Sequence, residues 1–144
     1  AAYLTERQLW DQALPEWRAL AAADPRDAEA RFGLGLVREA AGRPDEALED
    51  YRAAVALEPR TARYRRRLAE RLWQSEQYFQ ALNEWRTLKM QAPSDVEARL
   101  ALARALEKVG QPGDAYREYR ELLRLVPDQP DAERAVARLE GRRR

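Results

Sequence analysis

The sequence of 144 residues contains no cysteine and no histidine, which excludes the usual catalysis by thiol or imidazole groups. The absence of cysteine leaves the compartment open between cytoplasm and periplasm. The 26 basic and 25 acidic side chains give a net charge of only +1, whereas non-specific nucleic-acid binding needs a dominant positive charge. No uninterrupted apolar run approaches the length of a membrane-spanning helix. We therefore expect no nucleic-acid partner and no membrane insertion.

What the sequence does contain is a strict period of 34 residues. A proline, an alanine and, four residues after each alanine, a large aromatic residue recur at this interval. They are Pro25, Pro59, Pro93 and Pro127; Ala13, Ala47, Ala81 and Ala115; and Trp17, Tyr51, Trp85 and Tyr119. A period of this length over the whole chain is typical of a stacked-repeat protein, in which each unit contacts only its neighbours.

Within each period, apolar residues follow the three-and-four spacing of half-buried helices. The fold class is predicted to be all-α, built of antiparallel helix pairs, with about nine helical segments and no strand. Pro15 is expected to bend its helix or delay its start. Asp50 is placed on the solvent-exposed face of its helix. The expected segments are 1–8, 10–22, 27–41, 44–57, 61–74, 78–90, 94–109, 112–125 and 130–140.

The recurring small residues mark the positions where two helices cross closely. On the second helix of each pair this position is the periodic alanine, and on the first helix it is Gly35, Ala69 or Ala103. The periodic Trp and Tyr residues are expected to fill the gap toward the next pair. We interpret these aromatic residues as core rather than as a cofactor site or a base-stacking platform.

The period, together with Leu34-Gly35, Ala47, Tyr51 and Pro59 and their later counterparts, resembles the tetratricopeptide repeat. The resemblance divides the chain into a partial repeat at 1–27, full repeats at 28–61, 62–95 and 96–129, and a capping helix at 130–140. It implies a right-handed superhelix whose concave wall is lined by the first helix of each pair and binds peptides or partner proteins. The sequence departs from the family pattern at Arg31, Arg65 and Arg99, where a large residue is usual, and at Arg38, where an aromatic is usual.

The leading functional hypothesis is a protein-interaction scaffold, expected to be part of a larger protein or complex. The expected concave wall, here called the partner groove, combines an apolar patch with a row of arginines. Such a surface suits a peptide with acidic and aliphatic side chains, because the guanidinium fork matches carboxylates; alternatively, the arginines form a solvated face paired with nearby acids. Gly33 is placed on the same wall, and Arg134 and Arg138 extend it. The groove residues are Phe32, Leu36, Arg63, Arg66, Arg67, Glu70, Trp73, Leu100, Arg104 and Lys108.

Other functions are less well supported by these residues. Some family members clamp a C-terminal carboxylate with lysine, asparagine and arginine side chains. At the matching positions this chain has Phe32, Leu36, Arg67, Glu97 and Ala101, none of which fits, so this subtype is rejected. An enzyme is not expected, and no cofactor or metal, because the carboxylates lie on solvated faces with nothing to raise their pKa. RNA binding by a related class of helical repeats is a further alternative. That class has a period of 35 residues, whereas this chain has a period of 34 residues and balanced charge, so RNA binding is not favoured.

Self-association is a further expectation, drawn from the two ends of the repeat stack. Leu4, Leu9 and Trp10 belong to a partial repeat and should expose apolar surface at an open N-terminal edge. The final helix is expected to turn Arg134, Arg138 and Glu140 toward solvent as a cap. The chain begins partway through a repeat, so we expect it to be a piece of a longer protein or to self-associate through that edge.

Overall fold

The computed structural model describes the backbone of residues 2–143 and the side chains of residues 8–142. In this part of the chain there are eight α-helices and no strand. The chain forms two compact units, Ala1–Gln74 and Ser75–Arg144. The all-helical fold class expected from the apolar periodicity is confirmed.

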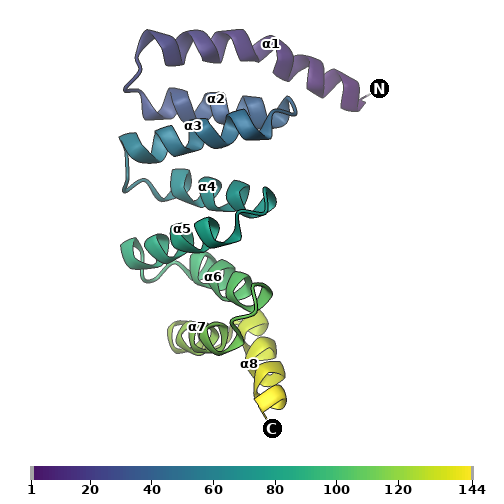
Figure 1. Ribbon diagram of the computed structural model, residues 1–144, viewed down its shortest axis with the longest axis vertical. Coiled ribbons are helices and arrows are strands. Elements are labelled where there is room, and N and C mark those ends of the chain that lie inside the picture. Colours follow the sequence, from purple (N-terminus) through teal and green to yellow (C-terminus); the bar gives the residue numbers. More distant parts are fainter. Residues whose placement is uncertain (1, 144) are drawn as a thin grey trace. The chain divides into compact units, whose positions relative to one another are not determined.

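The first unit contains four helices in sequence. These are α1 (Ala2–Ala23), α2 (Ala28–Ala40), α3 (Pro44–Leu57) and α4 (Ala62–Gln74). Each helix packs against the next along the chain, as Figure 1 shows for α1 through α4. Because the connections are short, consecutive helices run in opposite directions.

The second unit repeats this arrangement with α5 (Tyr78–Gln91), α6 (Val96–Lys108), α7 (Pro112–Leu125) and α8 (Pro130–Arg143). Here α5 packs on α6, α6 on α7 and α7 on α8. Helix α8 buries Ala132, Ala135 and Leu139.

The expected count of about nine helices is wrong by one, because the segments predicted at 1–8 and 10–22 form the single helix α1. Neither glycine nor proline separates the two segments, so nothing in the sequence ends a helix there. Pro15 lies inside α1 and does not interrupt it. Pro15 has no N–H to donate to the carbonyl of Asp11, so the helix loses one backbone hydrogen bond there. Both residues are exposed, so water can bind that carbonyl instead.

The ends of the helices follow the sequence signals closely. Asp27 and Asp95 cap α2 and α6, each accepting a hydrogen bond from a backbone N–H three residues later, at 3.0 and 3.1 Å. After α2 and α6 the chain turns through Gly42 and Gly110, with φ of 81° and 85°. The corresponding residue after α4 is Glu76, which adopts the same left-handed conformation with φ of 63°, although a side chain makes it less favourable than glycine.

The predicted helix crossings are confirmed. Ala47, Ala81 and Ala115 are fully buried, and Tyr51, Trp85 and Tyr119 lie in the core. A methyl group at Gly35 would lie 2.6 Å from the Tyr51 ring, so only glycine fits there. In the partial repeat, Ala13 and Trp17 are half-buried.

Gly33 does not lie on an open wall. It is buried, and a Cβ built on it would lie 2.0 Å from the Trp17 ring. The missing side chain therefore admits an aromatic ring from α1, which is a packing role and not a binding role.

Candidate functional site

In the first unit, the predicted groove residues come from α2 and α4. Leu36 and Trp73 are half-buried, Arg66 and Arg67 are partly exposed, and Arg63 and Glu70 are exposed. Contacts between α2 and α4 bring these two helices together on one surface: the Arg67 side chain reaches Glu39, at 3.2 Å, and Arg63 lies over the Phe32 ring. This surface offers a partner arginine side chains beside two apolar ones.

Phe32 differs from the other groove residues because it is only 8% exposed. Its ring lies 5.5 Å from that of Tyr51 and 4.7 Å from that of Tyr64, in tilted arrangements. The Arg63 guanidinium covers its remaining side at 5.6 Å. Phe32 is therefore a core residue beneath the groove, and a partner reaches it only after Arg63 moves.

Several arginines of this surface pair with acids. Glu39 accepts ion pairs from Arg67 at 3.2 Å and from Arg71 at 3.4 Å, and the Tyr51 hydroxyl donates to the same carboxylate. Burial, followed by this hydrogen bond to Glu39, raises the pKa of Tyr51 far above its ordinary value. The solvated-face interpretation thus holds for part of the arginine row, because Glu39 already neutralises part of its charge.

One polar cluster of the first unit differs from expectation. Asp50 is completely buried, not exposed. Its carboxylate accepts hydrogen bonds from Arg31 Nε at 2.7 Å and from Arg38 Nη1 at 2.9 Å. These two arginines are departures from the family pattern, so the buried carboxylate accounts for both.

The sequence carried a signal for this cluster. Acids recur at the Asp50 position with the same period, as Glu16, Glu84 and Glu118. In the second unit Glu118 binds Lys89 at 2.5 Å and Arg99 at 3.7 Å. An acid row on one helix and an arginine row on the preceding helix, both at 34-residue spacing, together predict such pairs.

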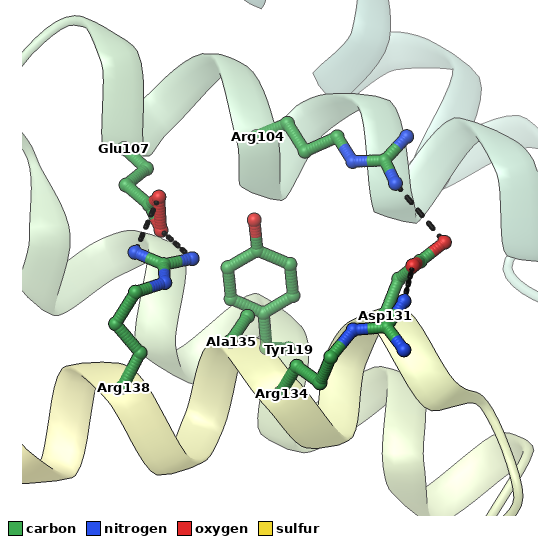
Figure 2. Close-up of a pocket in the computed structure, with 7 residues that line it drawn as sticks. All are labelled: Arg104, Glu107, Tyr119, Asp131, Arg134, Ala135 and Arg138. Carbon is green, nitrogen blue, oxygen red and sulfur yellow. Dashed lines mark hydrogen bonds and ion pairs between the residues drawn. The ribbon is translucent and has the colours of Figure 1, made fainter.

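In the second unit, the predicted groove residues lie on α6, where Leu100 is half-buried and Arg104 and Lys108 are exposed. Of these three, Arg104 lines a pocket of about 560 Å³ that is formed by α6, α7 and α8. Figure 2 shows Tyr119 of α7 between two groups of charged side chains in this pocket. Its other lining residues are Glu107 of α6 and Asp131, Arg134, Ala135 and Arg138 of α8.

Every residue of this pocket lies two repeat lengths after a residue of the first-unit surface. Arg104 corresponds to Leu36, Glu107 to Glu39 and Tyr119 to Tyr51. The α8 residues correspond in order to Arg63, Arg66, Arg67 and Glu70. The groove residues of the first unit and the pocket residues of the second therefore occupy equivalent positions of the repeat, with different side chains.

Two carboxylates organise the charges of the pocket. Arg138 and Glu107 form a two-pronged pair with distances of 2.8 and 2.9 Å. Asp131 accepts from Arg104 at 3.0 Å and also from Arg134. Tyr119 is 2% exposed, and burial together with the nearby Glu107 carboxylate raises its pKa, so its hydroxyl stays neutral at physiological pH.

Two kinds of site are not found in the described part of the chain. No helix there is both long enough and apolar enough to cross a membrane. Among the same residues, no three acidic side chains come together in a way that could hold a metal ion.

The comparisons with known proteins agree on the fold. A crystal structure of MamA superposes with a TM-score of 0.80 at 19% identity, over 92% of this chain and 78% of that one. MamA from Desulfovibrio magneticus RS-1 gives 0.77 at 19% identity, over 99% and 84%. YrrB, described as a TPR protein with an unusual peptide-binding site, gives 0.78 at 20% identity, over 97% and 72%.

Sequence comparison identifies the family directly. No curated protein sequence matches the chain significantly. Two family models, both described as tetratricopeptide repeat, match residues 2–62 and 96–139, which together make up most of the chain. The chain therefore belongs to the tetratricopeptide repeat family.

Proposed function

We propose that this protein is an interaction scaffold that binds a peptide, or an extended segment of a partner protein, in the partner groove. The observation that carries the proposal is that equivalent positions of the repeat form a surface of this kind in each of the two units. The same positions of the repeat present partly exposed arginines beside Leu36 and Trp73 in the first unit, and line a pocket in the second. The peptide-binding site named for YrrB supports the same kind of function here.

The surface supports binding without catalysis. Its arginines can bind acidic side chains of a partner, while Leu36 and Trp73 supply apolar area. Phe32 acts from below, because its ring supports the Arg63 guanidinium through a cation–π contact. The proposed partner segment therefore carries acidic and aliphatic side chains.

Two sets of variants test this function on a partner isolated by pull-down from the source cell. Replacing Arg63 and Arg66 with alanine is expected to slow association several-fold and flatten its salt dependence, because exposed charges act mainly on the encounter. Replacing Trp73 with alanine is expected to speed dissociation, with a loss of about 2 kcal/mol if Trp73 is a hot spot. Surface plasmon resonance at several salt concentrations measures both rates.

The matched control is Glu49→Arg, on the exposed surface of α3, where the side chain is 66% exposed. It should leave both rates unchanged. If Glu49→Arg abolishes binding while the groove variants bind like the parent protein, the partner binds another face and the proposed groove is wrong.

A second candidate function, self-assembly, is favoured by the apolar surface of α1. Leu9, Trp10 and Leu20 are 59%, 42% and 54% exposed; the Leu4 side chain lies outside the described residues. A net charge of +1 opposes association of two copies only weakly. We propose that a second copy of the chain covers this surface of α1.

Sedimentation velocity over a range of concentrations tests this second candidate. The parent chain should sediment as a larger species at high concentration, and Trp10→Asp should shift it toward the monomer, since a buried charge opposes the contact. Arg18→Asp, an exposed change on the same helix, is the control for charge alone. A parent chain that stays monomeric throughout would refute self-assembly.

A further inference from the structure

We propose that the pocket formed by α6, α7 and α8 binds the carboxylate of an acidic peptide side chain between Arg104 and Arg134, above the Tyr119 hydroxyl. This inference rests on the proposed function, since the carboxylate belongs to the bound segment. It specifies one contact of that segment and the residues that make it. All three side chains line the pocket, and Figure 2 shows the guanidinium groups of Arg104 and Arg134 directed toward Asp131, with the Tyr119 ring between them and the Glu107–Arg138 pair.

The charges of the pocket leave room for one further anion. Three guanidinium groups line it, against two carboxylates. Glu107 pairs with Arg138, which donates a hydrogen bond to one carboxylate oxygen at 2.9 Å and lies 2.8 Å from the other. Asp131 is instead shared, with one oxygen bonded to Arg104 and the other to Arg134. Each guanidinium has five N–H donors, so both arginines can bind a second carboxylate while they retain Asp131.

The space for this carboxylate comes from a single small side chain. At the position of Ala135 the first unit has Arg67, whose guanidinium binds Glu39 there. Alanine leaves this volume empty in the second unit and opens the pocket of about 560 Å³. In the first unit two arginines, Arg67 and Arg71, bind the equivalent acid Glu39, whereas in the second unit Arg138 binds Glu107 from the next turn of α8.

Tyr119 supplies a neutral donor at the base of the pocket. Its ring is buried, and Figure 2 shows its hydroxyl between the Glu107–Arg138 pair and Arg104. A phenol can donate one hydrogen bond while it accepts another. A tyrosine hydroxyl is protonated at neutral pH, and the pKa of Tyr119 is raised further by burial and by the Glu107 carboxylate, so the hydroxyl can donate to an anion.

The excess of one positive charge favours a monoanion. A carboxylate neutralises the pocket, whereas a phosphate of nearly two negative charges would leave it negative beside Glu107 and Asp131. A planar carboxylate also matches the guanidinium fork. Arg104 and Arg134 have side chains that are 59% and 73% exposed, so both can turn toward an entering ligand.

The test uses a capped peptide of alternating glutamate and leucine, the same peptide with glutamine in place of glutamate, and inorganic phosphate. Affinities are measured by isothermal titration calorimetry on the full chain. We expect the glutamate peptide to bind most tightly, with Arg104→Ala and Arg134→Ala each weakening it about tenfold, the effect of losing a charged hydrogen bond. Ala135→Arg restores the first-unit residue, fills the pocket and should abolish binding.

The matched control is Arg124→Ala, on α7, which removes the same charge from a side chain that is 78% exposed and paired with Glu121. It should bind like the parent chain. Circular dichroism melts verify that each variant is folded, and the exposed Arg104 and Arg134 variants keep the test valid if Ala135→Arg unfolds.

Three results would overturn the proposal: equal binding of the glutamate and glutamine peptides, tighter binding of phosphate than of the glutamate peptide, or equal losses in Arg104→Ala and Arg124→Ala. If the Arg63, Arg66 and Trp73 variants lose partner binding while the pocket variants bind the glutamate peptide like the parent chain, the pocket proposal is wrong and the groove proposal stands. Peptide binding in the pocket with no effect of those three variants on the partner would refute the wider groove.

Discussion

Replacing Asp50 with alanine is expected to lower the free energy of unfolding by about 3 kcal/mol, the lower end of the range for breaking a buried ion pair. The carboxylate is fully buried and binds both Arg31 and Arg38. Without it, two guanidinium groups remain near the core with no acid to match them. The lower end applies because the Arg31 side chain is 41% exposed and can regain water, whereas that of Arg38 is only 18% exposed.

Urea unfolding of the parent chain, Asp50→Ala and Glu49→Ala measures this effect. Glu49 is the matched control, since it is the adjacent acid on α3, 66% exposed and bonded to Arg52 on the surface. Its replacement should change stability by no more than about 0.5 kcal/mol. Equal unfolding midpoints for the two variants would show that the buried cluster contributes nothing to the fold.

A second comparison separates the lost attraction from the stranded charge. Arg38→Leu combined with Asp50→Ala should be less destabilising than the sum of the two single changes, because the pair is removed together. Strict additivity would mean that Arg38 and Asp50 act independently, despite their 2.9 Å contact.

The helix crossings were predictable from sequence because each is made by the same residue in every repeat. Ala47, Ala81 and Ala115 share one position in the period, and all three are fully buried. Whether two helices can cross closely depends on the size of one side chain, and that size is known from the residue type alone. A repeated small residue at helical spacing is therefore a reliable sign of a packed interface.

The buried acid was not predicted because its own pattern is ambiguous. A periodic acid on a helix is typical of a solvated face, and only a matching row of arginines on the preceding helix distinguishes Asp50 from Glu49. Those arginines, Arg31 and Arg38, were recognised as departures from the family pattern, but not as partners of an acid. Pairing the two periodic rows is the step that predicts the cluster.

The pocket could not be predicted because it depends on the absence of a side chain. The pocket is open at Ala135 because its side chain is small, whereas the equivalent residue two repeats earlier, Arg67, has a long side chain. The side chains that line it come from α6, α7 and α8, and their distances follow from helix packing that the sequence does not state. Of the predicted groove residues in the second unit, Arg104 borders the pocket, whereas Leu100 and Lys108 are not among its lining residues.

The second large effect expected is that of Phe32→Ala, which should lower the free energy of unfolding by about 3–5 kcal/mol. The sequence placed this ring in the partner groove, but it is 8% exposed and packs against Tyr51 and Tyr64. Its removal leaves a cavity beside two aromatic rings and takes away the surface on which Arg63 lies. Partner binding should weaken as well, as a consequence of the displaced arginine.

Thermal melts and binding rates measured on the same samples distinguish a core role for Phe32 from a direct contact with the partner. Phe79→Ala on α5 is the matched control, since that ring is 67% exposed and its loss should change stability by no more than about 0.5 kcal/mol. A core role predicts a lower melting point for Phe32→Ala, together with weaker partner binding that partly recovers on cooling, as the fold is regained. An unchanged melting point with faster dissociation would instead place Phe32 in direct contact with the partner, which requires the Arg63 side chain to move off the ring when the partner binds.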